Sequence, residues 1–120
     1  MSALEMLRST VDFEGINRGS HSRAHPALLV RYRRNELGRT RYGISTGRRV
    51  GSAVVRNRVR RRLRSILRRL ESNVQPGWDI LIVCRPQTAE MTQADLDSAL
   101  TRLMGSAGLL AATDETTGTN

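Results

Sequence analysis

The clearest hydrophobic pattern in the sequence lies between residues 53 and 70. Apolar side chains recur there every three or four residues and fall within about 80° of arc on a helix. They are Val55, Val59, Leu63, Ile66 and Leu70. Ser52 precedes this run and can accept a hydrogen bond from the first turn. The pattern therefore predicts a helix that begins after Ser52 and ends near Leu70.

Three other stretches have the hydrophobic patterns of strands. Apolar and polar residues alternate over 27–34, and a turn around Gly38 leads into a second stretch over 40–46. We expect these two strands to form a hairpin. The stretch 79–85 is uninterrupted and apolar between Ile80 and Cys84, which indicates a strand covered on both faces.

Two further helices are predicted at the ends of the chain. A short one is expected over 10–18, followed by a loop rich in Ser, His and Gly over 19–26. Thr92, with Asp95 three residues later, resembles a capping box before an apolar stripe. That stripe consists of Leu96, Leu100, Leu103 and Met104.

This order of elements predicts an α+β fold. We expect a two-layer sandwich of a small mixed sheet and about three helices. The 120-residue length suits one domain, which we place over residues 1–107. The polar residues 108–120 are expected to form a disordered tail.

Positive charge is concentrated in the middle of the chain. The net charge is +9, and all 20 basic residues are arginines. Residues 31–69 hold fifteen arginines and one acid, Glu36, a local net charge of +14. On the predicted helix the arginines occupy an arc beside the apolar face, and the helix contains no acid. Such a density favours a polyanionic partner.

Few residues offer catalytic chemistry of their own. Cys84, the only cysteine, lies inside an apolar strand and is expected to be inert. His21 and His25 are four residues apart in the predicted loop, where solvated histidines are favoured over a metal site. The sequence has no phosphate-binding loop, dinucleotide fingerprint or zinc-protease motif. We therefore predict no catalytic residue and no metal ligand in the protein.

The sequence also lacks signals for membranes or export. Its first ten residues have no apolar signal-peptide core, and its longest apolar run is far shorter than a bilayer-spanning helix. A cytoplasmic protein without membrane contact is expected.

One segment combines several features of anion binding. Residues 47–64 read GRRVGSAVVRNRVRRRLR: an arginine pair, a glycine turn, a helix start, and then Arg56-Asn57-Arg58. A glycine turn lets backbone approach a phosphate, and a helix N-terminus presents unpaired N–H groups. Asn57 can bond a sugar or base edge while arginines hold phosphate.

This segment resembles the signature of the bacterial ribonuclease P protein component. Its matching residues are Arg48, Arg49, Val50, Gly51, Ala53, Val54, Arg56, Asn57, Arg58, Arg60, Arg61 and Arg64. Outside it, Asp12-Phe13 is similar to an acidic–Phe pair in the family's first helix. Residues 29–32 and 79–86 are similar to two of its strands, so the resemblance covers about residues 7–104.

The resemblance implies a left-handed βαβ crossover and an accessory role in a ribonucleoprotein endonuclease. The catalytic RNA would carry out phosphodiester hydrolysis with Mg²⁺, while the protein assists removal of the 5′ leader from precursor tRNA, without an obligatory protein partner. Phe13 and Tyr32 would bind the leader, although packing inside the fold is an equal alternative for both. The residues implied to bind the RNA subunit are Arg48, Arg49, Gly51, Arg56, Asn57, Arg58, Arg60, Arg61, Arg64 and Arg68.

Two other functions are compatible with the charge. One is a non-catalytic structural RNA-binding protein of the ribosomal type. The other is a cationic helix that engages a membrane or an acidic protein, which does not account for the Arg-Asn-Arg pattern within a folded domain.

Overall fold

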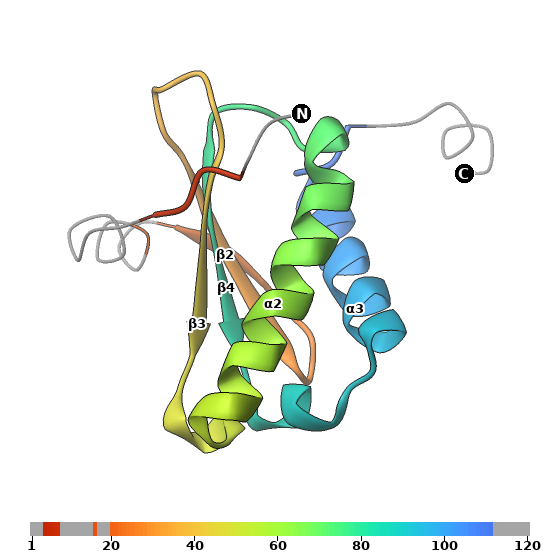
Figure 1. Cartoon of the computed structure of the whole chain (residues 1–120). Coiled ribbons are helices and arrows are strands. Elements are labelled where there is room, and N and C mark those ends of the chain that lie inside the picture. Colours follow the sequence, from red (N-terminus) through yellow and green to blue (C-terminus); the bar gives the residue numbers. More distant parts are fainter. Residues whose placement is uncertain (1–3, 8–15, 17–19, 112–120) are drawn as a thin grey trace.

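The computed structural model describes residues 4–7, 16 and 20–111, in which two long helices pack on one face of a four-stranded sheet (Figure 1). The strands are β1 (His21–Ala24), β2 (Leu28–Arg34), β3 (Arg41–Thr46) and β4 (Trp78–Cys84). The α-helices are α2 (Ala53–Leu70) and α3 (Gln93–Ser106). Three short 3-10 helices connect them: η1 (Arg48–Val50), η2 (Glu71–Asn73) and η3 (Pro86–Glu90). The predicted α+β sandwich is confirmed.

The strand order is β1-β2-β4-β3, which shows that the predicted hairpin between 27–34 and 40–46 is wrong. β4 lies between those two strands, antiparallel to β2 and parallel to β3. Its apolar run explains this position, because a central strand can bury both of its faces. Leu81 is buried on one face of the sheet, and Ile80 and Ile82 are buried on the other.

The hairpin partner of β2 is β1, in a segment that we expected to be a loop. His21 pairs with Tyr32, and Ala24 pairs with Leu29. All four residues of β1 are exposed, so the segment lacks the alternating burial that identifies a strand in a sequence. β1 is therefore an edge strand that depends on β2 for its conformation.

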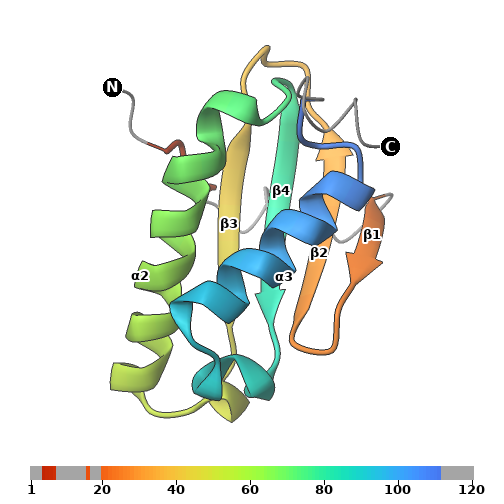
Figure 2. The same ribbon diagram turned by 90° about the vertical axis from the view of Figure 1, so that its right-hand side faces the viewer.

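The connection from β3 through α2 to β4 is a left-handed crossover. Figure 2 views the sheet from the helix side: β3 and β4 run down the page, β4 lies to the right of β3, and α2 runs back up to the left of β3, on the viewer's side of the sheet as Figure 1 shows. Most parallel connections have the opposite hand. The hand implied by the family resemblance is therefore present.

The main core lies between the sheet and the two helices, as the apolar stripes predicted. Ser52 Oγ accepts a hydrogen bond from Val55 N at 3.3 Å, and Thr92 Oγ1 accepts one from Asp95 N at 3.1 Å, so both predicted N-caps are confirmed. The buried helical side chains are Val59, Leu63, Ile66, Leu67, Leu70, Leu96, Ala99, Leu100, Leu103 and Met104.

The opposite face of the sheet holds a smaller apolar cluster of Leu7, Ile16 and Leu81. Ile16 is the one described residue of the helix predicted over 10–18, and it is helical and fully buried. The rest of that predicted helix, including Phe13, lies outside the described residues.

Packing continues beyond residue 107, where we placed the end of the domain. Leu109 is fully buried, and Leu110 forms a β-bridge with Val74. Ala111 N donates to Asn73 O at 2.5 Å. The segment 109–111 thus pairs with residues 73–75, at and after the end of η2.

Candidate nucleic-acid interface

The candidate interface begins in the turn between β3 and α2. Arg48 and Arg49 are exposed on η1, directly before the N-terminus of α2. Gly51 joins the two elements with φ +152°, and a Cβ atom built there would lie 3.0 Å from both Cβ and Cγ1 of Val55. Because both the backbone conformation and the space require glycine, Gly51 fixes how η1 meets the helix.

Seven of the candidate arginines form what we call the outer arginine surface. It comprises the exposed side of η1 and the side of α2 that faces away from α3: Arg48, Arg49, Arg56, Arg60, Arg61, Arg64 and Arg68. None of the seven forms an ion pair with another described residue. The described part of the chain therefore leaves the charge of these seven side chains unneutralised.

Two polar side chains hold part of this surface in position. Arg60 Nη1 donates to Thr46 Oγ1 at 2.7 Å, and its Nη2 donates to Asn57 Oδ1 at 3.3 Å. Asn57 is exposed and keeps its amide N–H₂ for other acceptors. Arg60 is thus a preorganised cation beside β3, whereas Arg61 and Arg68 are exposed and have no side-chain hydrogen bond among the described residues.

Three other arginines of α2 point toward η3 and α3. Arg58 Nη2 donates to Ala89 O at 3.3 Å, and its Nε is buried without a hydrogen-bond partner. Arg62 Nη1 donates to Met91 O at 2.8 Å. Arg69 forms an ion pair with Asp97 at 2.5 Å. The structure therefore separates Arg58 from the other arginines predicted to bind RNA.

A buried carboxylate that we did not identify from the sequence lies at the start of β4. Asp79 has no exposed side-chain surface and accepts hydrogen bonds from Arg41 at 2.8 and 2.9 Å and from Asn35 at 2.9 Å. Arg33 adds a second positive charge, 3.6 Å from the carboxylate. Burial alone would raise the pKa of Asp79, but these hydrogen bonds and charges outweigh it and hold the pKa below its ordinary value.

Of the two aromatic residues predicted to bind the leader, the structure describes Tyr32 but not Phe13. Tyr32 is 5% exposed on the helix-covered face of the sheet, and its ring centroid lies 5.7 Å from that of Trp78 and 5.6 Å from that of His21. This burial favours a role for Tyr32 in packing inside the fold over a role in binding the leader. Phe13 lies outside the described residues, so its place in the leader site stays a prediction.

The cysteine and the two histidines that we considered for catalysis each lie in a strand or a turn of the sheet. Cys84 is buried, and burial raises the pKa of its thiol to about 12, which keeps it protonated and unreactive at neutral pH. His21 is exposed on β1, and His25 lies in the turn between β1 and β2. Within the described ranges, no three His, Cys, Asp or Glu residues are grouped as metal ligands would be.

Comparison with known proteins decides the family. A family model described as ribonuclease P matches residues 1–108. The chain belongs to the ribonuclease P protein family. The ribonuclease P protein component of Oceanobacillus iheyensis is 33% identical over 105 residues, which cover 87% of each chain. The component of Symbiobacterium thermophilum is 35% identical over 105 residues, covering 87% of this chain and 91% of the relative.

Solved ribonuclease P proteins share the fold. The Staphylococcus aureus protein matches with a TM-score of 0.83 and 26% identity, covering 88% of this chain and 96% of that one. The Thermotoga maritima protein matches with a TM-score of 0.75 and 27% identity, covering 82% and 93%.

Membership in the ribonuclease P family establishes the class of activity. The chain is a protein subunit of ribonuclease P, a ribonuclease whose catalysis is carried by its RNA and which generally uses metal ions. The ribosomal alternative is not favoured. In the part of the chain that the structure describes, no helix is long and apolar enough to cross a membrane.

Proposed function

We propose that the outer arginine surface binds the RNA subunit of ribonuclease P. The observation that carries the proposal is that seven arginines crowd η1 and one side of α2 without an ion pair among the described residues. Guanidinium groups can each donate two bonds to a phosphate. Phosphates of a folded RNA would therefore supply the missing negative charge.

The N-terminus of α2 adds to this site. Its unpaired N–H groups and the positive end of its dipole favour an anion at the point where Arg48 and Arg49 are exposed. Asn57 would contact a sugar or base edge between arginines that hold phosphates. Gly51 and Arg58 would support the surface by fixing η1 and η3 against α2.

We further propose precursor tRNA as the substrate, with its single-stranded 5′ leader bound near Phe13. Stacking on an aromatic ring tolerates any base, which suits leaders of varied sequence. The metal ion would be Mg²⁺ held mainly by the RNA, since the described residues offer no grouped oxygen ligands for it. The protein's cations would stabilise the folded, Mg²⁺-bound RNA by replacing condensed counterions.

Competition between RNAs tests this function. A labelled ribonuclease P RNA is bound to the full-length protein and challenged with unlabelled ribonuclease P RNA or with ribosomal RNA of equal nucleotide concentration. The proposal predicts that the first competitor displaces the label at a much lower concentration. Equal competition by the two RNAs would show that the surface binds RNA in general and does not prefer the RNA subunit of ribonuclease P.

A further inference from the structure

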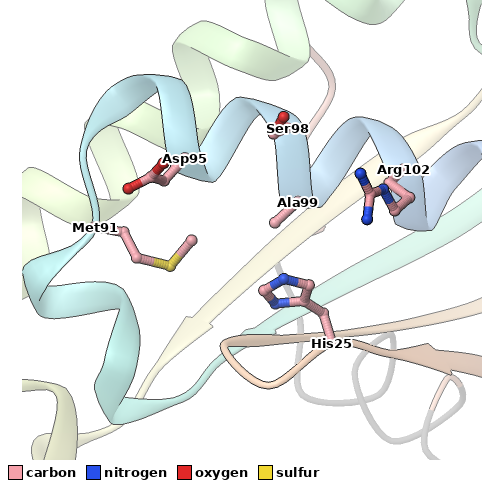
Figure 3. A pocket seen from close by; sticks show the side chains of 6 residues that line it. All are labelled: His25, Met91, Asp95, Ser98, Ala99 and Arg102. Carbon is pink, nitrogen blue, oxygen red and sulfur yellow. The ribbon is translucent and has the colours of Figure 1, made fainter.

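An open pocket of about 280 Å³ lies between α3 and the turn that joins β1 to β2, away from the outer arginine surface. Figure 3 shows the turn between β1 and β2 forming one wall and α3 forming the other. The lining residues are His25, Met91, Asp95, Ser98, Ala99 and Arg102. The proposed binding of the RNA subunit and of the 5′ leader does not use these histidine, arginine and carboxylate side chains.

His25 is fixed in the pocket wall by its own turn. The backbone of His25 exchanges hydrogen bonds with Leu28, and Arg85 Nη1 donates to His25 O at 3.3 Å. The Ala27 backbone N–H donates to His25 Nδ1 at 3.0 Å. Because Nδ1 accepts this bond, the ring proton of the neutral imidazole is on Nε2. His25 therefore offers a preorganised N–H donor.

Arg102 lies opposite this donor. Its side chain is exposed and forms no ion pair or hydrogen bond with any described residue. In Figure 3 its guanidinium and the His25 ring flank the same space, next to Ala99. An N–H donor and a guanidinium facing one space are the groups that bind a phosphate oxygen.

The other end of the pocket has the opposite character. Asp95 lies seven positions before Arg102 on α3, about 10 Å along the helix axis. Figure 3 shows Met91 beside Asp95, with Ala99 between the two charged ends, so these two residues give the pocket an apolar wall. A ligand that fits this order carries an anion, then a flat apolar body, and then an N–H donor for the Asp95 carboxylate.

We propose that this pocket binds one unpaired nucleotide whose base carries an amino group. The phosphate would lie between His25 and Arg102, the base would pack on Met91, and the amino group would donate to Asp95, as carboxylates accept from cytosine N4. The pocket lies away from the outer arginine surface, so this nucleotide would belong to a different part of the bound RNA, and only this identification of the nucleotide's source rests on the proposed function.

A titration of the full-length protein with mononucleotides tests the proposal. We expect 5′-CMP to cause saturable shifts of the Ser98 and Ala99 amide resonances in NMR spectra. 5′-UMP and inorganic phosphate should bind more weakly, because uracil has no amino group and phosphate has no base. R102A should weaken CMP binding about tenfold, the value of one charge-assisted hydrogen bond. D95N should abolish the preference for CMP over UMP.

Two controls separate the pocket from the rest of the surface. R39A removes an exposed arginine that pairs with Glu5 far from the pocket, and it should leave the CMP affinity unchanged. R61A should weaken binding of the RNA subunit but not of CMP. If CMP causes no saturable shift while the RNA subunit still binds, the pocket proposal alone fails. If inorganic phosphate binds as tightly as CMP, the pocket holds a free anion and the nucleotide assignment is wrong.

Discussion

Arg61 and Arg62 are neighbours in the sequence, yet the structure gives them different roles. Arg61 is exposed on the outer arginine surface, whereas Arg62 is half-buried and donates to Met91 O at 2.8 Å. Each substitution by alanine removes one positive charge from the same turn of α2. A comparison of the R61A and R62A variants therefore distinguishes the loss of a phosphate contact from a general loss of positive charge.

The expected magnitude follows from counterion release. Each phosphate contact contributes about 0.7 to 0.9 to the slope of log affinity against log salt. If all seven outer arginines reach phosphates, the slope is about −5 to −6. R61A should flatten this slope by about 0.7 to 0.9. The loss of affinity between 50 and 200 mM salt should therefore be about threefold smaller for the variant than for the unsubstituted protein.

R62A should behave in the opposite way. It should change the salt slope by less than half as much, because its guanidinium faces η3, and it should lower the free energy of unfolding by about 1 kcal/mol through the lost hydrogen bond. Filter binding of ribonuclease P RNA at several salt concentrations gives the slopes, and urea denaturation gives the stabilities. Equal slope changes in the two variants would refute the division of the arginines.

Three other predictions concern stability and reactivity. G51A should lower the free energy of unfolding by about 1–3 kcal/mol in urea melts, since φ +152° and Val55 oppose a Cβ atom; an unchanged midpoint would contradict this. Asp79 has a lowered pKa, so its stabilisation is present above the ordinary value of 3.8 and is lost as pH falls through the folded-state pKa. D79N should cost about 2–4 kcal/mol at pH 7 and lose that part of the acid dependence; a variant whose acid profile parallels that of the unsubstituted protein would refute the role of Asp79. Cys84, whose pKa is raised to about 12, should resist a thiol reagent at pH 8 until the protein unfolds, and rapid native-state labelling would disprove its burial.

The elements with strong local patterns were predictable from the sequence. α2 has an apolar stripe of helical period and a serine cap, and both are local properties. β1 was missed because all four of its residues are exposed, and the hairpin was wrong because strand order is decided by non-local burial. β4 can lie in the centre of the sheet because it has apolar side chains on both of its faces, and both faces are buried.

The candidate interface was predictable as an arc of arginines but not in detail. Whether an arginine of α2 faces solvent or a carbonyl depends on where η3 lies, and η3 is about thirty residues away in the sequence. The alternation of β2 placed Tyr32 on the same face as Leu28 and Val30, and the helices cover that face. The role of Asp79 was not identified because its hydrogen-bond partners, Arg41 and Asn35, are far from it in the sequence.

The central claim is that this protein assists an RNA that carries out the cleavage. The most direct test is a Mg²⁺ titration of precursor tRNA cleavage by a bacterial ribonuclease P RNA, with and without the purified full-length protein. We expect the protein to shift the midpoint to a lower Mg²⁺ concentration, because its arginines replace counterions on the RNA. A midpoint that does not move when the protein is added at saturating concentration would show that the protein does not assist the RNA in this way.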